Sequence, residues 1–142
     1  MVDDFQTRNI PIDGIGMQMH VGLNLSMENF RHALEEITAR GLKVHLSEVD
    51  IQVNTHGKAS EFTDSLALSQ KEKMEEIVRE YNRLPDENKF AITFWGLRDN
   101  DSWLSNHTGF RQWPLLFDRN LQKKPMYQGF LDGLEVAQST IK

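Results

Sequence analysis

Segments with strand-like and helix-like spacing of apolar residues alternate along this chain. From Gly14 to Val21 every second residue is apolar, which is the period of a β-strand. A second strand-like run extends from about Lys43 to Val53, and a third from Phe90 to Gly96. Apolar residues at helical spacing follow the three runs: Phe30, Ala33, Leu34 and Ile37, then Met74, Ile77, Val78, Tyr81 and Leu84, and finally Tyr127, Phe130, Leu131, Leu134 and Ile141. This alternation predicts βαβ units with a parallel sheet.

The expected helices carry signals at their ends. Ser26 is a candidate N-cap of the first helix, and Gly41 is placed to end it. Residues 69–72 (S-Q-K-E) have the spacing of a capping box, so we expect the second helix to begin there. Gly129 and Gly133 weaken the prediction of the last helix, because glycine in a helix interior costs about 1 kcal/mol.

Composition excludes several classes of protein. With 142 residues the chain is expected to be a single segment, residues 1–142, that can bury a core. A net charge of −5 gives no reason to expect nucleic acid or an anionic membrane as partner. No apolar run approaches the roughly 18 residues of a membrane span, and the first residues do not resemble a signal peptide. The absence of cysteine rules out disulfides and leaves the compartment open.

Polar side chains gather where the expected strands end. Gln18 and His20 share a face near the end of the first strand, and Glu48 and Asp50 share one on the second. Trp95 follows at the end of the third. Ligands of parallel α/β folds bind at this edge. Each pair is also compatible with a purely structural role as an ion-pair partner, but three such groups at one edge favour a functional site.

Several motifs resemble glycoside hydrolase family 10. They are I-P-I-D-G-I-G-M-Q-M-H (Ile10 to His20), S-E-V-D-I (Ser47 to Ile51) and F-W-G-L-R-D-N-D-S-W-L (Phe94 to Leu104). P-L-L-F-D (Pro114 to Asp118) and K-K-P-M-Y (Lys123 to Tyr127) resemble the family's closing segment. Members are chiefly endo-1,4-β-xylanases. The resemblance therefore implies an α/β fold that is a partial TIM (β/α)8 barrel, made of the last three β/α units at the C-terminal end of the catalytic domain.

The resemblance also implies roles for individual residues. Glu48 matches the catalytic nucleophile, His20 the histidine that hydrogen-bonds it, and Asp50 the carboxylate that orients this histidine. Gln18 matches a glutamine that lines the same site. Hydrogen bonds to a carboxylate favour its charged form, as a nucleophile requires.

Two tryptophans, Trp95 and Trp103, match the pair that walls the sugar site. Indole faces stack on the apolar faces of pyranose rings and help to exclude water. The substrate implied is xylan or a xylo-oligosaccharide. We expect no cofactor and no metal, because His56 and His107 lack a second ligand at metal spacing.

One catalytic group of the family has no counterpart in this sequence. A retaining glycosidase needs a second carboxylate, about 5–5.5 Å from the first, as acid/base. The family carries it in an Asn-Glu motif, and no Asn-Glu dipeptide occurs here. A whole barrel has about 250 residues. We therefore expect the isolated chain to be inactive or very weak unless another segment supplies the acid/base.

A non-catalytic role is the alternative. The chain would then be a self-associating unit or a weak sugar-binding module. A sheet of three parallel strands leaves two open edges and an uncovered face, which favours association. We therefore expect a homo-oligomer or a complex with a complementing N-terminal barrel segment.

Overall fold

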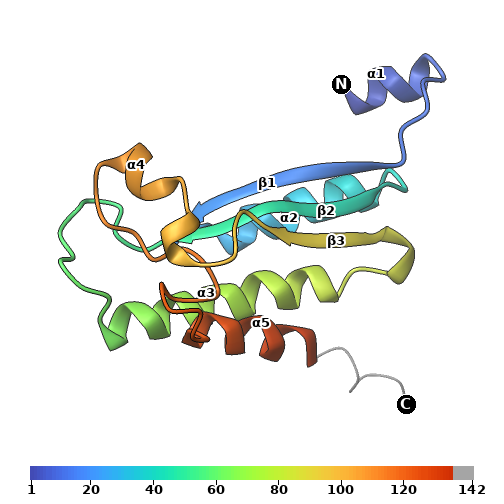
Figure 1. Cartoon of the computed structure of the whole chain (residues 1–142). Coiled ribbons are helices and arrows are strands. Elements are labelled where there is room, and N and C mark those ends of the chain that lie inside the picture. The colour runs from blue at the N-terminus through green and yellow to red at the C-terminus, as the bar shows by residue number, and fades with distance from the viewer. Residues whose placement is uncertain (136–142) are drawn as a thin grey trace.

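Three parallel strands and the helices that follow them form the body of the protein (Figure 1). The computed structural model describes residues 1–135. The strands lie in the order β1-β2-β3, and each pairs in parallel with its neighbour. The bounds are β1 Gly14–Gly22, β2 Lys43–Gln52 and β3 Lys89–Phe94, with helices α2 Met27–Thr38, α3 Asp64–Asn82 and α5 Pro125–Glu135 after them. The predicted succession of three β/α units is thus confirmed.

Short elements fill the remaining segments. The helix α1 (Val2–Thr7), which the sequence did not predict, lies beyond the amino end of β1. A 3-10 turn, η1 (Asp86–Asn88), precedes β3. The long connection between β3 and α5 contains a second such turn, η2 (Asp99–Asp101), and a short helix, α4 (Leu104–Thr108). Loops of this length usually carry short structure of their own.

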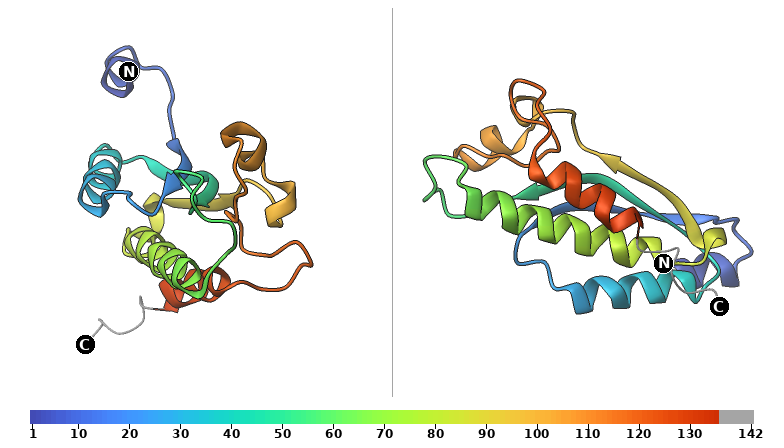
Figure 2. Two further views of the ribbon diagram at one scale, coloured as in Figure 1. Left: turned by 90° about the vertical axis from the view of Figure 1, so that its left-hand side faces the viewer. Right: turned by 90° about the horizontal axis from the view of Figure 1, so that it is seen from below.

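Within the described residues, the long helices lie on one face of the sheet. Figures 1 and 2 show α2 and α3 along this face, with α5 packed against α3. The core lies between these layers and comprises, from the strands, Met19, Val44, Leu46, Val49 and Ile51, and from the helices, Phe30, Leu34, Ile37, Met74, Ile77, Val78, Tyr81 and Met126. On β1, Ile15, Met17 and Val21 are half-buried against this core, whereas Gly16 and Gln18 face away from it and are exposed. This second side is called the open face below.

The ends of the helices confirm two sequence signals and correct a third. Ser26 accepts a hydrogen bond from the backbone N–H of Asn29, and Gly41 has a left-handed φ of 71°, as predicted. The capping box predicted at residues 69–72 is wrong. The helix begins earlier, at Asp64, with Thr63 as its N-cap. Residues 69–72 lie inside it, because Ala67 and Gln70 extend its buried side toward the N-terminus.

The glycines of α5 serve a close helix contact. A Cβ atom on Gly133 would lie 2.7 Å from Val78 Cβ, and one on Gly129 would collide with the backbone carbonyl of Lys71. Both neighbours belong to α3, so the missing side chains let the two helices approach. The helix forms despite its glycines because this contact compensates their low helix propensity. Of the predicted helix, Ile141 lies outside the described residues.

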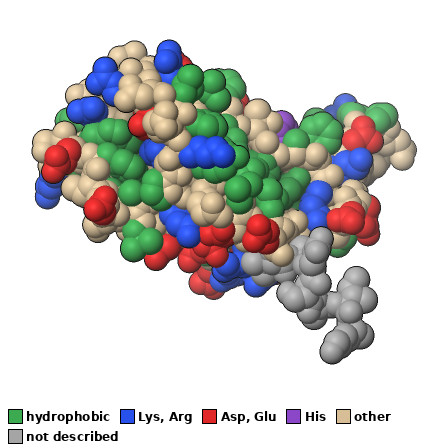
Figure 3. Space-filling view, turned by 60° about the horizontal axis from the view of Figure 1, so that its bottom comes forward, with side chains coloured by type: hydrophobic (Ala, Val, Ile, Leu, Met, Phe, Trp, Pro, Cys, Tyr) green, Lys and Arg blue, Asp and Glu red, His purple; other side chains and the backbone are tan. Residues whose placement is uncertain are grey.

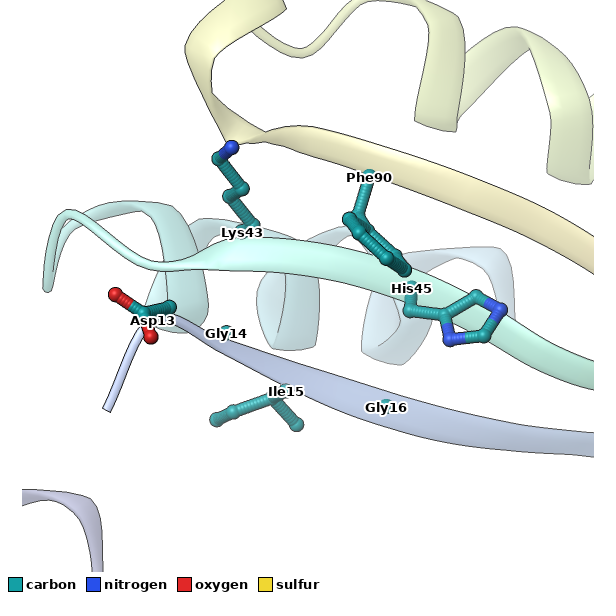
Figure 4. A pocket seen from close by; sticks show the side chains of 7 residues that line it. All are labelled: Asp13, Gly14, Ile15, Gly16, Lys43, His45 and Phe90. Carbon is teal, nitrogen blue, oxygen red and sulfur yellow. The ribbon is translucent and has the colours of Figure 1, made fainter. Parts of the chain in front are cut away.

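The amino end of the open face is hollow. Side chains from all three strands surround a cavity of ≈ 330 Å³ lined by Asp13, Gly14, Ile15, Gly16, Lys43, His45 and Phe90 (Figure 4). The two glycines present no side chain to it, while the rings of His45 and Phe90 meet edge to face at 5.3 Å. Phe90 is 67% exposed. A large apolar ring in this position lacks the cover that a closed barrel would provide.

Candidate active site

His20 connects two strands at the carboxyl edge of the open face. It lies near the end of β1, and its Nε2 is 2.9 Å from a carboxylate oxygen of Glu48 on β2. Its Nδ1 is 2.9 Å from Asp50 Oδ2. The side-chain amide of Gln18 donates to the other oxygen of Glu48 over 3.0 Å. The structure thus brings together the four polar side chains that the sequence placed at this edge.

Glu48 occupies a β-bulge that the sequence did not predict. Between the pairs Gln18–Ser47 and His20–Asp50, β1 advances by two residues and β2 by three. At the bulge Glu48 adopts a left-handed φ of 56°. This conformation costs a non-glycine residue about 1–2 kcal/mol. Bulges and residues in such conformations are frequent at functional sites, where they aim a side chain.

The bulge also shifts which side chains face the helices. Leu46 before it and Val49 after it are both buried in the core, although they are three residues apart. In a regular strand such residues point to opposite faces. The extra residue therefore keeps Glu48 and Asp50 on the open face while β2 still fills the core with apolar side chains.

Asp50 is the buried member of the site. Its side chain is 1% exposed, and its Oδ2 accepts a hydrogen bond from Trp103 Nε1 over 3.0 Å in addition to the contact with His20. Burial raises the pKa of Asp50, while the hydrogen bonds from Trp103 and His20 act in the opposite direction. The imidazole can donate to both Asp50 and Glu48 only if both of its nitrogens carry a proton.

Two indole rings flank the histidine. The ring of Trp95 lies 6.1 Å from that of His20, and the ring of Trp103 lies 5.0 Å from it, both edge on. Trp95 follows β3 directly, and its backbone N–H donates to the carbonyl of Val49. The two indoles are 47% and 37% exposed, so part of each ring is available to a ligand. Trp113, by contrast, is buried against Phe62.

Polar contacts anchor the connection that carries Trp103. The backbone N–H of Asn54, after β2, donates to Gln112 Oε1, and Gln112 Nε2 donates to the backbone carbonyl of Asn54. Farther along, Lys124 Nζ lies 3.1 Å from Asp99 Oδ1, and both residues are buried. These anchors were not predicted from the sequence, because isolated polar residues in a long loop show no periodicity. The available signals were the motifs that contain them, K-K-P-M-Y for Lys124 and F-W-G-L-R-D-N-D-S-W-L for Asp99.

The arrangement suits nucleophilic or general-base chemistry at Glu48. Each oxygen of its carboxylate has a polar partner, Gln18 or His20, and the carboxylate lies beside partly exposed aromatic rings. Asp50 is less available, because its Oδ2 already contacts two groups and its side chain is buried.

Within residues 1–135 no group of three or more His, Asp or Glu side chains is placed to hold a metal ion. In the same part of the chain, no helix is long and apolar enough to cross a membrane.

Comparison with solved structures identifies the architecture. The chain superimposes with a TM-score of 0.88 and 37% identity on a mutant xylanase 10C from Cellvibrio japonicus in complex with xylopentaose. A thermostable mutant of xylanase Xyn10A from the same organism gives a TM-score of 0.86 with 36% identity. Each match covers 94% of this chain, but only 29% and 43% of the respective xylanase chain. The three β/α units are therefore part of a TIM barrel, and they do not close a barrel by themselves.

Sequence comparison gives the same relatives. Endo-β-1,4-xylanase Xyn10C of Cellvibrio japonicus is 37% identical over 99% of this chain, and endo-1,4-β-xylanase A of the same species is 37% identical over 94%. The chain spans about a quarter of the length of these two relatives (26% and 24%). The family model for glycosyl hydrolase family 10 matches residues 1–133. This protein chain therefore belongs to glycosyl hydrolase family 10.

Proposed function

We propose that this chain provides the nucleophile-bearing part of a retaining endo-1,4-β-xylanase. The observation that carries the proposal is the environment of Glu48, whose two oxygens are held by Gln18 and His20. The Glu48 carboxylate attacks the anomeric carbon of a xylosyl unit while the acid/base donates a proton to the glycosidic oxygen of the leaving sugar, and a covalent glycosyl-enzyme forms. Water then attacks the same carbon and releases Glu48, so the product keeps its β-configuration.

The residues around Glu48 have distinct tasks in this reaction. His20 and Gln18 fix the carboxylate and stabilise its negative charge by hydrogen bonding. Asp50 holds the imidazole from the other side and so sets its orientation. Trp95 and Trp103 form the wall against which the xylose ring stacks. Xylan or a xylo-oligosaccharide is the proposed substrate, which the xylopentaose bound to a related xylanase supports.

The acid/base is proposed to come from a complementing N-terminal barrel segment. No Asn-Glu dipeptide occurs in the 142 residues, and Asp50 is engaged by His20 and Trp103. The match with a related xylanase covers 43% of the xylanase chain. More than half of that chain therefore has no counterpart in this one. The open face and the edges of β1 and β3 are the surfaces on which such a segment would complete the barrel.

A mixing experiment tests this proposal. The chain is combined with the part of Xyn10C that precedes its matched region, and hydrolysis of xylo-oligosaccharides is measured together with the anomeric configuration of the first product. We expect β-configured product from the mixture and none from either part alone. The Glu48→Gln variant should remove activity, whereas Glu61→Gln, an exposed control in a loop, should not. Stable complex formation without hydrolysis would contradict the proposal.

A second candidate is a non-catalytic, self-associating or weakly sugar-binding module. The observation that favours it is the exposed apolar surface. Figure 3 shows hydrophobic side chains gathered on the face that carries α5, and Leu97 and Leu134 are exposed in addition to Phe90. Sedimentation of the isolated chain distinguishes the candidates. A tight homo-oligomer that excludes the N-terminal segment would support the module, and a monomer that captures this segment would support the enzyme.

A further inference from the structure

We propose that Lys124 and Asp99 are positioning residues whose buried ion pair holds Trp103 against Asp50. The inference deepens the proposed function and rests on it, because Trp103 matters to the reaction only as a wall of the sugar site. Neither charged residue touches the site itself. Their effect would pass through the connection between β3 and α5, in which Trp103 lies.

The ion pair gathers several backbone groups of this connection. Lys124 Nζ lies 3.1 Å from Asp99 Oδ1 and donates to the carbonyls of Trp113 (2.6 Å) and Leu115 (2.9 Å). Asp99 Oδ1 also accepts from the backbone N–H of Leu115 over 2.9 Å. The ring of Phe62 covers the ammonium group at 4.6 Å. Lys124, at the end of the connection, therefore binds Asp99 near its start and the carbonyls of Trp113 and Leu115 in between.

A closed circuit of contacts leads from this pair to the site. The backbone N–H of Ile51, next to Asp50, donates to the carbonyl of Pro114. Leu115 follows and is bound to Asp99. Asp99 begins the η2 turn, and its carbonyl accepts from the N–H of Ser102, directly before Trp103. Trp103 Nε1 then returns to Asp50 Oδ2. Lys124 is not a member of this circuit but supports it where Leu115 meets Asp99, because its Nζ contacts both Asp99 Oδ1 and the carbonyl of Leu115.

A second contact ties the same segment to α3. The buried side chain of Gln70 donates to the carbonyls of Ile51 and Trp113. The carbonyl of Trp113 thus accepts from both Gln70 and Lys124, one from a helix and one from the end of the connection. A hydrophobic residue at position 124 could fill the volume but could not bind the two carbonyls and the carboxylate together.

Burial makes this link sensitive to the loss of either partner. It raises the pKa of Asp99 and lowers that of Lys124, while their mutual attraction acts against both shifts. Removal of one partner leaves a buried charged or polar group without compensation. Lys124→Met should therefore loosen the turn at Asp99, and Asp99→Asn should act in the same direction with a smaller effect, since the amide still accepts from Leu115.

The test reads out Trp103 directly in the full chain. Tryptophan is labelled with ¹⁵N, and the indole N–H signal of Trp103 is assigned with Trp103→Phe. In Lys124→Met we expect this signal to shift and its N–H to exchange with solvent about tenfold faster, since it loses a hydrogen bond to a carboxylate. The signal of Trp95 should stay in place. Lys123→Met is the matched control, because Lys123 is exposed and lies over Tyr127.

Each outcome decides the question. A folded Lys124→Met protein with an unchanged Trp103 signal would overturn the proposal. Loss of folding in both Lys124→Met and Asp99→Asn would also overturn it, since the pair would then support the fold as a whole. The readout needs no substrate, so it is independent of the proposed reaction. If Trp103 responds but the mixture with the N-terminal segment lacks Glu48-dependent activity, the proposed function fails while the positioning contact stands.

Discussion

The two ends of the open face differ in the contacts that their side chains make. At the carboxyl end, Gln18, His20, Glu48 and Asp50 contact one another across two neighbouring strands. At the amino end, glycines and an exposed Phe90 surround a hollow of ≈ 330 Å³ (Figure 4). A polar site on adjacent strands can thus be organised within three β/α units, whereas an apolar barrel interior needs side chains from across the barrel.

Removal of His20 should have the largest effect on stability. His20→Ala leaves Glu48 with its contact to Gln18 and the buried Asp50 with only its contact to Trp103. We expect the free energy of unfolding to fall by about 1–3 kcal/mol, as when buried polar groups lose their partner. Urea unfolding measures this loss. His45→Ala at the amino end is the matched control, since it removes a hydrogen bond with Thr93 and an edge-to-face contact with Phe90, both exposed, and should have a smaller effect. An equal loss in free energy of unfolding for the two substitutions would contradict the proposed difference between the ends.

Filling the hollow should weaken binding of the N-terminal segment without changing the stability of the isolated chain. A Cβ on Gly16 would meet only Ser47 Oγ, at 3.7 Å, so Gly16→Val should change the free energy of unfolding of the isolated chain by no more than about 0.5 kcal/mol. The same valine should hinder binding of the N-terminal segment, which we would measure by sedimentation of the mixture. Gly14→Val is the contrasting variant, because its Cβ would lie 2.7 Å from the carbonyl of Lys43 and should destabilise the chain itself. Unimpaired binding by Gly16→Val would show that the hollow is not part of the interface.

An ion pair distant from both ends should produce the smallest effect. Asp132 of α5 lies 2.9 Å from Lys71 of α3. Hydrogen bonds from Gln128 and Lys71 lower the pKa of Asp132. Because its folded pKa lies below the unfolded value of about 4, the carboxylate adds stability above that pH and loses it as the pH falls through the folded value. Asp132→Asn should flatten the acid side of a stability–pH curve and leave the site unchanged. An identical acid side in the variant would refute this assignment.

The sequence predicted the parts of this molecule that follow from periodicity. The apolar residues at alternate positions of β1 and at helical spacing in α2 and α3 had to face a common core, so the order of the elements could be read directly. The polar groups at the strand ends followed from the parallel topology. Trp95 was expected at the end of a strand from Phe90 to Gly96, and it lies directly after β3, which ends at Phe94.

Features that depend on tertiary contact could not be predicted in this way. The bulge at Glu48 arises from pairing with β1 and β3 together, and S-E-V-D-I contains no glycine to signal a left-handed residue. The start of α3 was misplaced because S-Q-K-E has the spacing of a capping box inside a helix. The bond from Trp103 to Asp50 joins residues 53 positions apart, and only the folded connection brings them together.

The most direct test of a preformed nucleophile uses an aryl β-xylobioside with a very good leaving group. Its phenolate departs with little protonation, so the first step depends on Glu48 and hardly on the acid/base. Phenolate release is measured for the chain mixed with the N-terminal segment of Xyn10C, and for the same mixture made with Glu48→Gln. We expect release to fall by about a thousandfold or more in the variant. Equal release from both mixtures, or none from a stable complex, would contradict the assignment of Glu48 as the nucleophile.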